Sequence, residues 1–275
     1  MRSDIGMSPK QPLISTTELS QVLDEVKLFD LRWSLTAPTA GRASYQEGHI
    51  PGAVFVDLDR DLAAEEGDGR HPLPATDDFV ANLGRLGLSP DDEVVVYDDQ
   101  GGAVAARMWW MLESIGHPGQ VSVLDGGLQE WVGQGLPVAS GSVTREPVVY
   151  PPVAGYTGVV RHDELEGRFL ADLRSPERYR GETEPVDPKA GHIPGAVNLP
   201  LAGNLDDGRF RTSRDLDHAY RDFPDDGIVS CGSGVNACHG ALALVIAGRP
   251  MPDIYIGSFS DWSRRDLPVT TGPNP

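Results

Sequence analysis

The chain has 275 residues, of which 39% are hydrophobic and 23% charged, as in an ordinary globular protein of about two domains. Its net charge of -18 argues against general binding to nucleic acids or anionic membranes, because phosphate-rich surfaces attract basic proteins. No apolar run approaches the ~20 residues of a membrane span, and residues 1–13 lack the apolar core of a secretory signal. We therefore expect a cytoplasmic protein in which residues 1 to about 12 form a loose tail.

Strand-like and helix-like segments alternate along the first half of the chain. A capping box of Ser15 and Glu18 predicts a first helix, and Thr76 opens another that carries Phe79 and Leu83. Short β-branched runs predict strands at residues 26–31, 53–58, 93–97 and 121–124. This alternation predicts an α/β fold with a buried parallel sheet, in which ligands bind at the carboxyl ends of the strands.

A long internal repeat organises the sequence. The segment Gly-His-Ile-Pro-Gly-Ala-Val occurs at residues 48–54 and again at 191–197, and similar strand ends precede the two copies at residues 28–32 and 170–174. A period of this length predicts two copies of one domain, because solenoid repeats are shorter. We expect a first domain at residues 13–140, a linker rich in proline and glycine at 141–158, and a second domain at 159–275.

The second copy contains a cysteine loop between a strand-like segment, residues 227–229, and a helix-like one, residues 241–247. Cys231 follows the strand, and glycines at 232 and 234 allow backbone conformations that a side chain would disfavour. N–H groups of the loop and the positive end of the helix dipole would favour a thiolate here. The residues expected to form this N–H cradle are Gly232, Ser233, Gly234, Val235, Asn236 and Ala237.

Three further observations concern the chemistry of this loop. Aligning the copies places Asp98 of the first domain opposite Cys231, so only the second domain is expected to be catalytic. A cysteine phosphatase would need an arginine where this chain has Ala237, which makes phosphatase chemistry unlikely. Cys238 is expected inside the helix core, and no cysteine or histidine cluster has the spacing of a zinc site.

From about Leu13 to Val269 the chain resembles the two-domain rhodanese family of sulfurtransferases. The resemblance rests on the repeated Gly-His-Ile-Pro-Gly-Ala segments, the single cysteine loop, and the tryptophan motifs at residues 126–131 and 257–262. It implies two tandem rhodanese-like domains, each a parallel sheet flanked by helices. It also implies that Cys231 takes sulfur from a small anionic donor as a persulfide and passes it to a thiophilic acceptor. That acceptor is cyanide, a thiol or a protein such as thioredoxin, and no cofactor is needed.

The resemblance leaves the donor open between 3-mercaptopyruvate and thiosulfate. The cysteine loop is similar to that of the mercaptopyruvate enzymes, since it lacks the cationic residues of the thiosulfate branch. Arg178 matches the arginine that binds the substrate carboxylate, but Asp187 stands where mercaptopyruvate enzymes carry a second arginine. Arg180 is a candidate for the other cation, with a solvated surface arginine as the alternative.

A hydroxyl relay is also implied for mercaptopyruvate enzymes. Ser233 matches its hydroxyl and His49 its histidine, but residues 34–48 contain no aspartate to complete it. The alternative is that His49 caps a turn, because His192 occupies the same place in the other copy. Residues 70–74 are expected to border the cleft without an assigned role.

A second class of function stays open at this stage. The chain could be a binding or sulfur-relay module whose persulfide is loaded by a partner protein rather than by turnover of a small donor.

Overall fold

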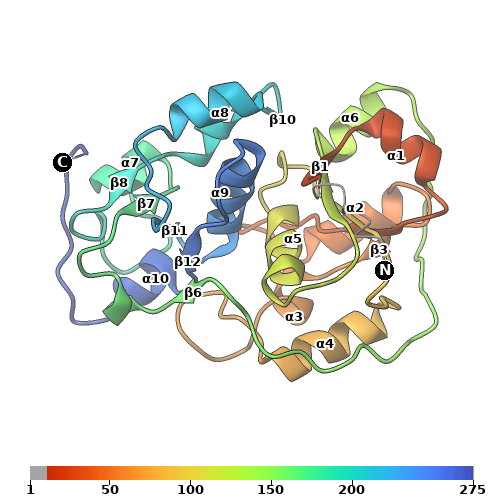
Figure 1. The fold of residues 1–275 in the computed structure, drawn as a ribbon, viewed down its shortest axis with the longest axis horizontal. Helices are drawn as coiled ribbons and strands as arrows, with labels where there is room; N and C mark the ends of the chain where they lie inside the picture. The colour runs from red at the N-terminus through yellow and green to blue at the C-terminus, as the bar shows by residue number, and fades with distance from the viewer. Residues whose placement is uncertain (1–10, 275) are drawn as a thin grey trace, which may run out of the picture.

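Two parallel five-stranded sheets form the centres of two α/β domains in the computed structural model, which describes residues 11–274 (Figure 1). The first sheet has the order β1-β5-β4-β2-β3 and the second β6-β12-β11-β7-β8. The first sheet contains β1 (Leu13–Ile14), β2 (Lys27–Asp30), β3 (Val54–Phe55), β4 (Val94–Tyr97) and β5 (Val121–Leu124). The second sheet contains β6 (Val159–Val160), β7 (Leu170–Asp172), β8 (Val197–Asn198), β11 (Ile228–Ser230) and β12 (Asp253–Tyr255). The two orders are equivalent, which confirms the predicted α/β fold and its duplication.

Helices connect the strands in both domains. The first domain contains α1 (Thr16–Val22), α2 (Ala40–Glu47), α3 (Leu58–Asp61), α4 (Thr76–Arg85), α5 (Ala105–Ser114) and α6 (Gly127–Gly133). The second contains α7 (Pro176–Arg180), α8 (Ser213–Ala219), α9 (Val235–Ile246) and α10 (Ser258–Trp262), with short 3-10 turns η1 (His162–Glu164) and η2 (Leu201–Asn204). A hairpin of β9 (Leu205–Asp206) and β10 (Arg209–Phe210) completes it. The expected capping box is present, because Ser15 Oγ accepts the Glu18 N–H and Glu18 Oε2 accepts the Ser15 N–H.

The two domains meet along α5 and α9, which lie side by side at the centre of the molecule (Figure 1). Both helices are buried along most of their length, and one apolar cluster continues from Trp109 and Trp110 of α5 to Leu242 of α9. Removing this much apolar surface from water stabilises the contact between the domains. The amino end of α9 is thereby held against the first domain.

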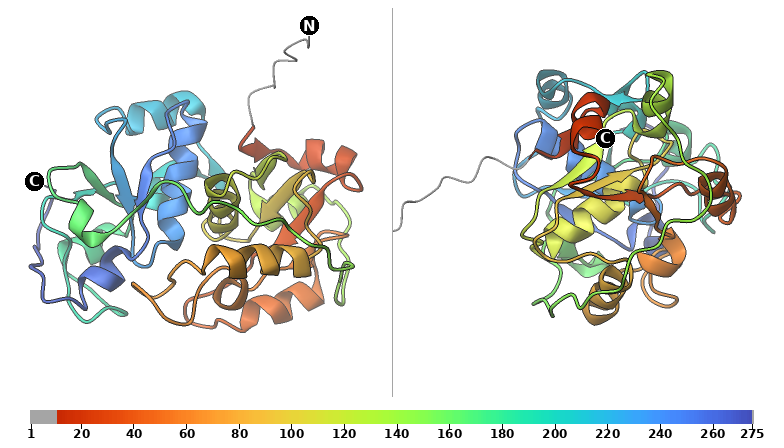
Figure 2. Two further views of the ribbon diagram at one scale, coloured as in Figure 1. Left: turned by 60° about the horizontal axis from the view of Figure 1, so that its bottom comes forward. Right: turned by 90° about the vertical axis from the view of Figure 1, so that its right-hand side faces the viewer.

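Residues 141–158 run between the domains without helix or strand, and Figure 2 shows this segment crossing the surface beside α4. Several contacts with the first domain hold it in place, of which two lie beside α4 and α5. The Val148 N–H donates to the Gly84 carbonyl at 2.9 Å, and the Tyr156 ring stacks on Trp110 with centroids 6.4 Å apart. The expected tail at residues 1 to about 12 lies almost wholly outside the described residues.

Within residues 11–274, no helix is long and apolar enough to cross a membrane.

Candidate active site

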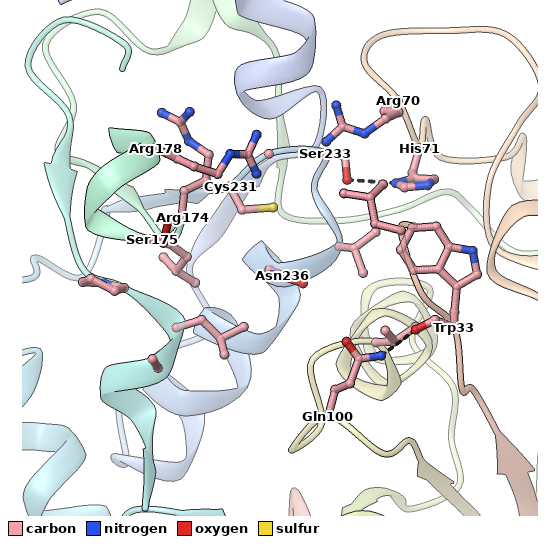
Figure 3. A pocket seen from close by; sticks show the side chains of 18 of the residues that line it. Trp33, Arg70, His71, Gln100, Arg174, Ser175, Arg178, Cys231, Ser233 and Asn236 are labelled. Carbon is pink, nitrogen blue, oxygen red and sulfur yellow. Dashed lines mark hydrogen bonds between the residues drawn. The ribbon is translucent and has the colours of Figure 1, made fainter. Parts of the chain in front are cut away.

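A cavity of about 380 Å³ lies between the two domains, next to the carboxyl end of β11. Figure 3 shows side chains from both domains around it, with the Cys231 thiol at its wall. The first domain contributes Trp33, Leu35, Arg70, His71, Gln100 and Val104. The second contributes Leu173, Arg174, Ser175, Pro176, Arg178, Pro200, Leu201, Ala202, Cys231, Gly232, Ser233, Val235 and Asn236. The location is the one expected for a ligand site in a parallel sheet.

Cys231 directly follows β11 and is 3% exposed. Its Sγ accepts the Gly234 N–H at 3.1 Å, and its own N–H donates to Ser258 Oγ at 3.1 Å. Gly234 has φ +81°, and a Cβ there would lie 2.3 Å from the Ile256 carbonyl oxygen, so the turn requires glycine. Because α9 begins at the next residue, the positive end of its dipole faces the sulfur.

Asp98 of the first domain lies at the position equivalent to Cys231. The registers of β4 on β2 and of β11 on β7 are equivalent and place Asp98 and Cys231 at matching positions. The Asp98 carboxylate accepts four backbone N–H groups at 2.7 to 2.9 Å. The donors are those of Gln100, Gly102, Val104 and Ala105. A strand, loop and helix arranged in this way can therefore surround a small anionic group, here the two oxygens of a carboxylate, with backbone N–H donors.

Ser233, in the cysteine loop, is hydrogen-bonded across the domain boundary to His71. The Ser233 Oγ and His71 Nδ1 atoms are 2.8 Å apart, and His71 Nε2 lies 3.3 Å from Asp59 Oδ1. Asp59 is fixed in turn by the Trp33 indole N–H, which donates to its other carboxylate oxygen at 2.9 Å. Since an ionised carboxylate only accepts, we assign the ring proton to Nε2, which leaves Nδ1 to accept the Ser233 hydroxyl.

The environment of His71 keeps its ring neutral. Burial, together with the charges of Arg107 and Arg70, lowers the pKa of His71 to about 4 despite the opposing effect of Asp59. Arg107, a buried cation on α5, also donates from Nη2 to the His71 carbonyl oxygen at 3.0 Å. At pH 7 the neutral imidazole can therefore accept the Ser233 hydroxyl through Nδ1, and its lowered pKa makes it a weak base.

His49, the histidine that the sequence pairs with Ser233, does not reach the cavity. Its ring stacks on Tyr45 with centroids 4.1 Å apart, and its Nδ1 lies 2.8 Å from the Tyr45 carbonyl oxygen. His192 makes the same two contacts with Tyr179 in the second domain, at 3.8 and 2.8 Å. The structure thus assigns the repeated histidines to the turns before β3 and β8, and His71 takes the place beside Ser233.

Comparing the two copies of the sequence could have identified His71 and Asp59. The segment Asp-Gly-Arg-His at residues 68–71 matches Asp-Gly-Arg-Phe at 207–210, and Asp59 matches Ala202. Both residues of the relay are thus present in one copy only, as Cys231 is. Functional residues could have been found as positions at which the two copies differ. His49 is not such a position, because the other copy has His192 there.

The two candidate arginines have different surroundings. Arg178 of α7 lines the cavity, and its side chain is 19% exposed. Arg180 is not among the residues that line the cavity, and its guanidinium pairs with Glu182 at 2.7 Å. Two further arginines line the cavity, Arg174 of the second domain and Arg70 of the first. No role was assigned to Arg70 from the sequence.

Cys238 lies inside α9 and is fully buried. Burial raises the pKa of its thiol to about 12, and the thiol donates to the Gly234 carbonyl at 3.3 Å. It therefore has the properties of a core residue, as expected. In the part of the chain that the structure describes, no cluster of three or more histidine, cysteine, aspartate or glutamate side chains could hold a metal ion.

Comparisons with known proteins agree with this architecture. The family described as the rhodanese-like domain matches residues 15–134 and 161–265. The chain belongs to the rhodanese family of sulfurtransferases. As an enzyme of this kind it has a sulfur donor and a sulfur acceptor as substrates.

Relatives named for both donors are similar to this chain over nearly its whole length. A protein of Pseudomonas aeruginosa named "Probable 3-mercaptopyruvate sulfurtransferase" is 42% identical, over 94% of this chain and 98% of its own. The thiosulfate sulfurtransferase of Rattus norvegicus is 35% identical, over 94% of each chain. The structure of the 3-mercaptopyruvate sulfurtransferase from Leishmania major superimposes with a TM-score of 0.83 at 30% identity, covering 93% of this chain and 76% of that one.

Proposed function

We propose that this sulfurtransferase takes sulfur from 3-mercaptopyruvate and carries it as a persulfide on Cys231. The observation that supports this donor is the hydrogen-bonded series Ser233, His71 and Asp59 beside the Cys231 loop. Such a series moves protons, and the two candidate donors differ in whether a proton must move.

The transfer from 3-mercaptopyruvate balances as follows. The Cys231 thiolate attacks the donor's thiol sulfur, an S–S bond forms, and the donor's C–S bond breaks with its electron pair left on carbon as the enolate of pyruvate. The proton of the donor's thiol passes to that carbon, which yields pyruvate and leaves Cys231 as the persulfide anion. Ser233 and the neutral His71 would relay this proton, with Asp59 orienting the imidazole.

Thiosulfate makes no such demand. Attack of the thiolate on its outer sulfur breaks the S–S bond and releases sulfite with the electron pair, and no proton changes place. A built proton relay would therefore serve mercaptopyruvate and add nothing for thiosulfate.

The remaining roles follow from the charge that develops at the sulfur. We assign residues 232 to 237 to the N–H cradle of the persulfide anion, by analogy with the four N–H groups around Asp98. We assign Arg178 to the donor's carboxylate, because it is the cavity-lining arginine that matches the family's substrate arginine. In the cytoplasm, the location expected from the sequence, small thiols and a protein thiol such as thioredoxin are the acceptors that we propose.

Steady-state kinetics with the two donors test the proposal. With cyanide and with dithiothreitol as acceptors, kcat/KM for 3-mercaptopyruvate should exceed that for thiosulfate by about tenfold or more. An equal or higher kcat/KM for thiosulfate would contradict the proposed donor. Loading of Cys231 only from another persulfidated protein, with neither small donor turned over, would instead support a sulfur-relay module.

A further inference from the structure

Asp187 joins the two domains at the edge of the cavity. Its side chain is completely buried, and its carboxylate lies between two arginines from different domains. Oδ1 accepts from Arg70 Nη1 at 2.5 Å, and Oδ2 accepts from Arg178 Nη2 at 3.1 Å. A residue in the position of the family's second arginine thus carries the opposite charge and holds a pair of arginines together.

Both guanidinium groups also face the cysteine loop. A Cβ on Gly232 would lie 3.2 Å from Arg70 Nη2 and 3.4 Å from Arg178 Nη1, and Figure 3 shows the two side chains near Cys231. Among the described residues, Arg70 Nε is buried with no hydrogen-bond partner. The Nη groups of the two arginines that face the cysteine loop can donate to an anionic ligand in the cavity.

The local charges nevertheless balance. Arg178 is paired a second time, with Glu184 at 2.7 Å. Glu184 also pairs with the cavity-lining Arg174 at 3.3 Å, and Arg174 pairs with Asp172 at 2.7 Å. Three guanidinium groups, those of Arg70, Arg174 and Arg178, thus face three carboxylates, those of Asp172, Glu184 and Asp187. Burial opposes ionisation of Glu184, but the hydrogen bond from Arg178 and backbone N–H groups lower its pKa overall. Because these charges cancel, the site offers a dianion little net attraction to offset its desolvation cost, which is larger than that of a ligand with one negative charge.

We propose that Asp187 determines the charge of the donor that this site accepts, and that Arg70 supplies the second cation that the family places at position 187. By neutralising the arginine pair, Asp187 makes the cavity favour a monoanionic donor such as 3-mercaptopyruvate over the thiosulfate dianion. This inference rests on the proposed function, since it concerns how the same site selects its donor.

The substitution Asp187→Asn keeps the size of the side chain and removes its charge. It should raise the ratio of kcat/KM for thiosulfate to kcat/KM for 3-mercaptopyruvate by about tenfold. Glu182→Gln is the matched control, because it removes a carboxylate from the same segment that is 55% exposed and pairs with Arg180. A ratio that changes in Asp187→Asn no more than in Glu182→Gln would overturn the proposal.

Arg70→Gln tests the proposal in the opposite direction and covers the case in which Asp187→Asn fails to fold. Without this cation the negative charge of Asp187 is only partly compensated. The ratio of kcat/KM for thiosulfate to kcat/KM for 3-mercaptopyruvate should therefore fall below that of the unsubstituted enzyme. A rise in the ratio, or an equal loss for both donors, would contradict the role given to Arg70.

Calorimetric binding of inert anions separates this inference from the proposed function. Enzyme freed of persulfide by cyanide should bind pyruvate more tightly than sulfate, and Asp187→Asn should reverse or narrow that preference. If the enzyme turned over neither donor, the proposed function would fail while this binding test still decided the role of Asp187. An unchanged preference in Asp187→Asn would overturn the inference even in an active enzyme.

Discussion

His71 and Phe210 occupy equivalent positions after the repeated Asp-Gly-Arg segment, and each projects toward the other domain. His71 is hydrogen-bonded to Ser233 of the second domain, whereas the Phe210 ring lies 3.3 Å from a Cβ placed on Gly102 of the first. Each residue therefore contacts the loop that precedes the central helix of the other domain, α9 for His71 and α5 for Phe210. Only the contact made by His71 carries a titratable group to the cysteine loop.

Replacing His71 by the residue of the other copy should separate the two donors. In His71→Phe, kcat/KM for 3-mercaptopyruvate should fall by about 100-fold or more, because the relay loses its base. Activity with thiosulfate should stay within about threefold, since its transfer moves no proton. Ser233→Ala should show the same division, and parallel losses for both donors in these variants would contradict the relay.

His49→Asn serves as the control for that experiment. His49 packs on Tyr45 outside the cavity, so any loss of activity should follow loss of folded protein and affect both donors equally. A selective loss with 3-mercaptopyruvate in this variant would restore His49 to the relay.

Gly234→Ala should both destabilise the protein and disable it. The new Cβ would meet the Ile256 carbonyl oxygen, and a positive φ adds strain, so we expect a loss of about 3 kcal/mol or more in the free energy of unfolding. Gly248→Ala is the matched control, because it has the same φ of +81° with open space around it, and should cost only about 1 kcal/mol. Urea unfolding measures both, and equal losses would show that the contact with Ile256 is unimportant.

Asp98→Ala should destabilise the first domain and leave the surroundings of Cys231, in the second domain, unchanged. Four backbone N–H groups, three of them in buried hydrogen bonds, lose their acceptor, so the free energy of unfolding should fall by about 3 kcal/mol or more. Asp99→Ala, at the neighbouring half-buried position, is the control and should cost much less. A stability of Asp98→Ala close to that of the control would contradict the role of this carboxylate as the centre of an N–H cradle.

Stability should decrease as the pH falls from about 6.5 to about 4. Burial lowers the pKa of His239 to about 4, and that of His71 equally, so in this range the unfolded chain binds protons that the folded chain cannot. Each histidine then costs up to about 3 kcal/mol at pH 4, and this loss is absent above pH 6.5. His239→Gln should lose less stability between pH 7 and pH 4.5 than the unsubstituted protein does, and an identical loss in urea titrations would contradict the prediction.

The fold and the nucleophile could be predicted because they are local or repeated features of the sequence. The strands show as short β-branched runs, the duplication as a repeated heptapeptide, and Cys231 as a cysteine between a strand and a glycine loop. The partner of Ser233 could not be predicted in this way. His71 lies in a loop without periodicity and meets Ser233 only because α5 packs on α9 and joins the domains.

The arginine pair was missed for a related reason. The sequence shows Asp187 where the family has its second arginine. The arginine that takes over, Arg70, comes from the other domain, and only the folded chain brings it next to Asp187 and Arg178. Arg180, nearer to Arg178 in sequence, points elsewhere because Glu182 binds its guanidinium.

Mass spectrometry of the loaded protein tests the central claim most directly. Protein cleared of persulfide by cyanide is incubated with 3-mercaptopyruvate, and its intact mass and peptides are measured without reductant. We predict a gain of one sulfur atom on the peptide that carries Cys231, retained in Cys238→Ser and absent in Cys231→Ser. No gain in the unsubstituted protein, or a sulfur atom that persists in Cys231→Ser, would contradict the account.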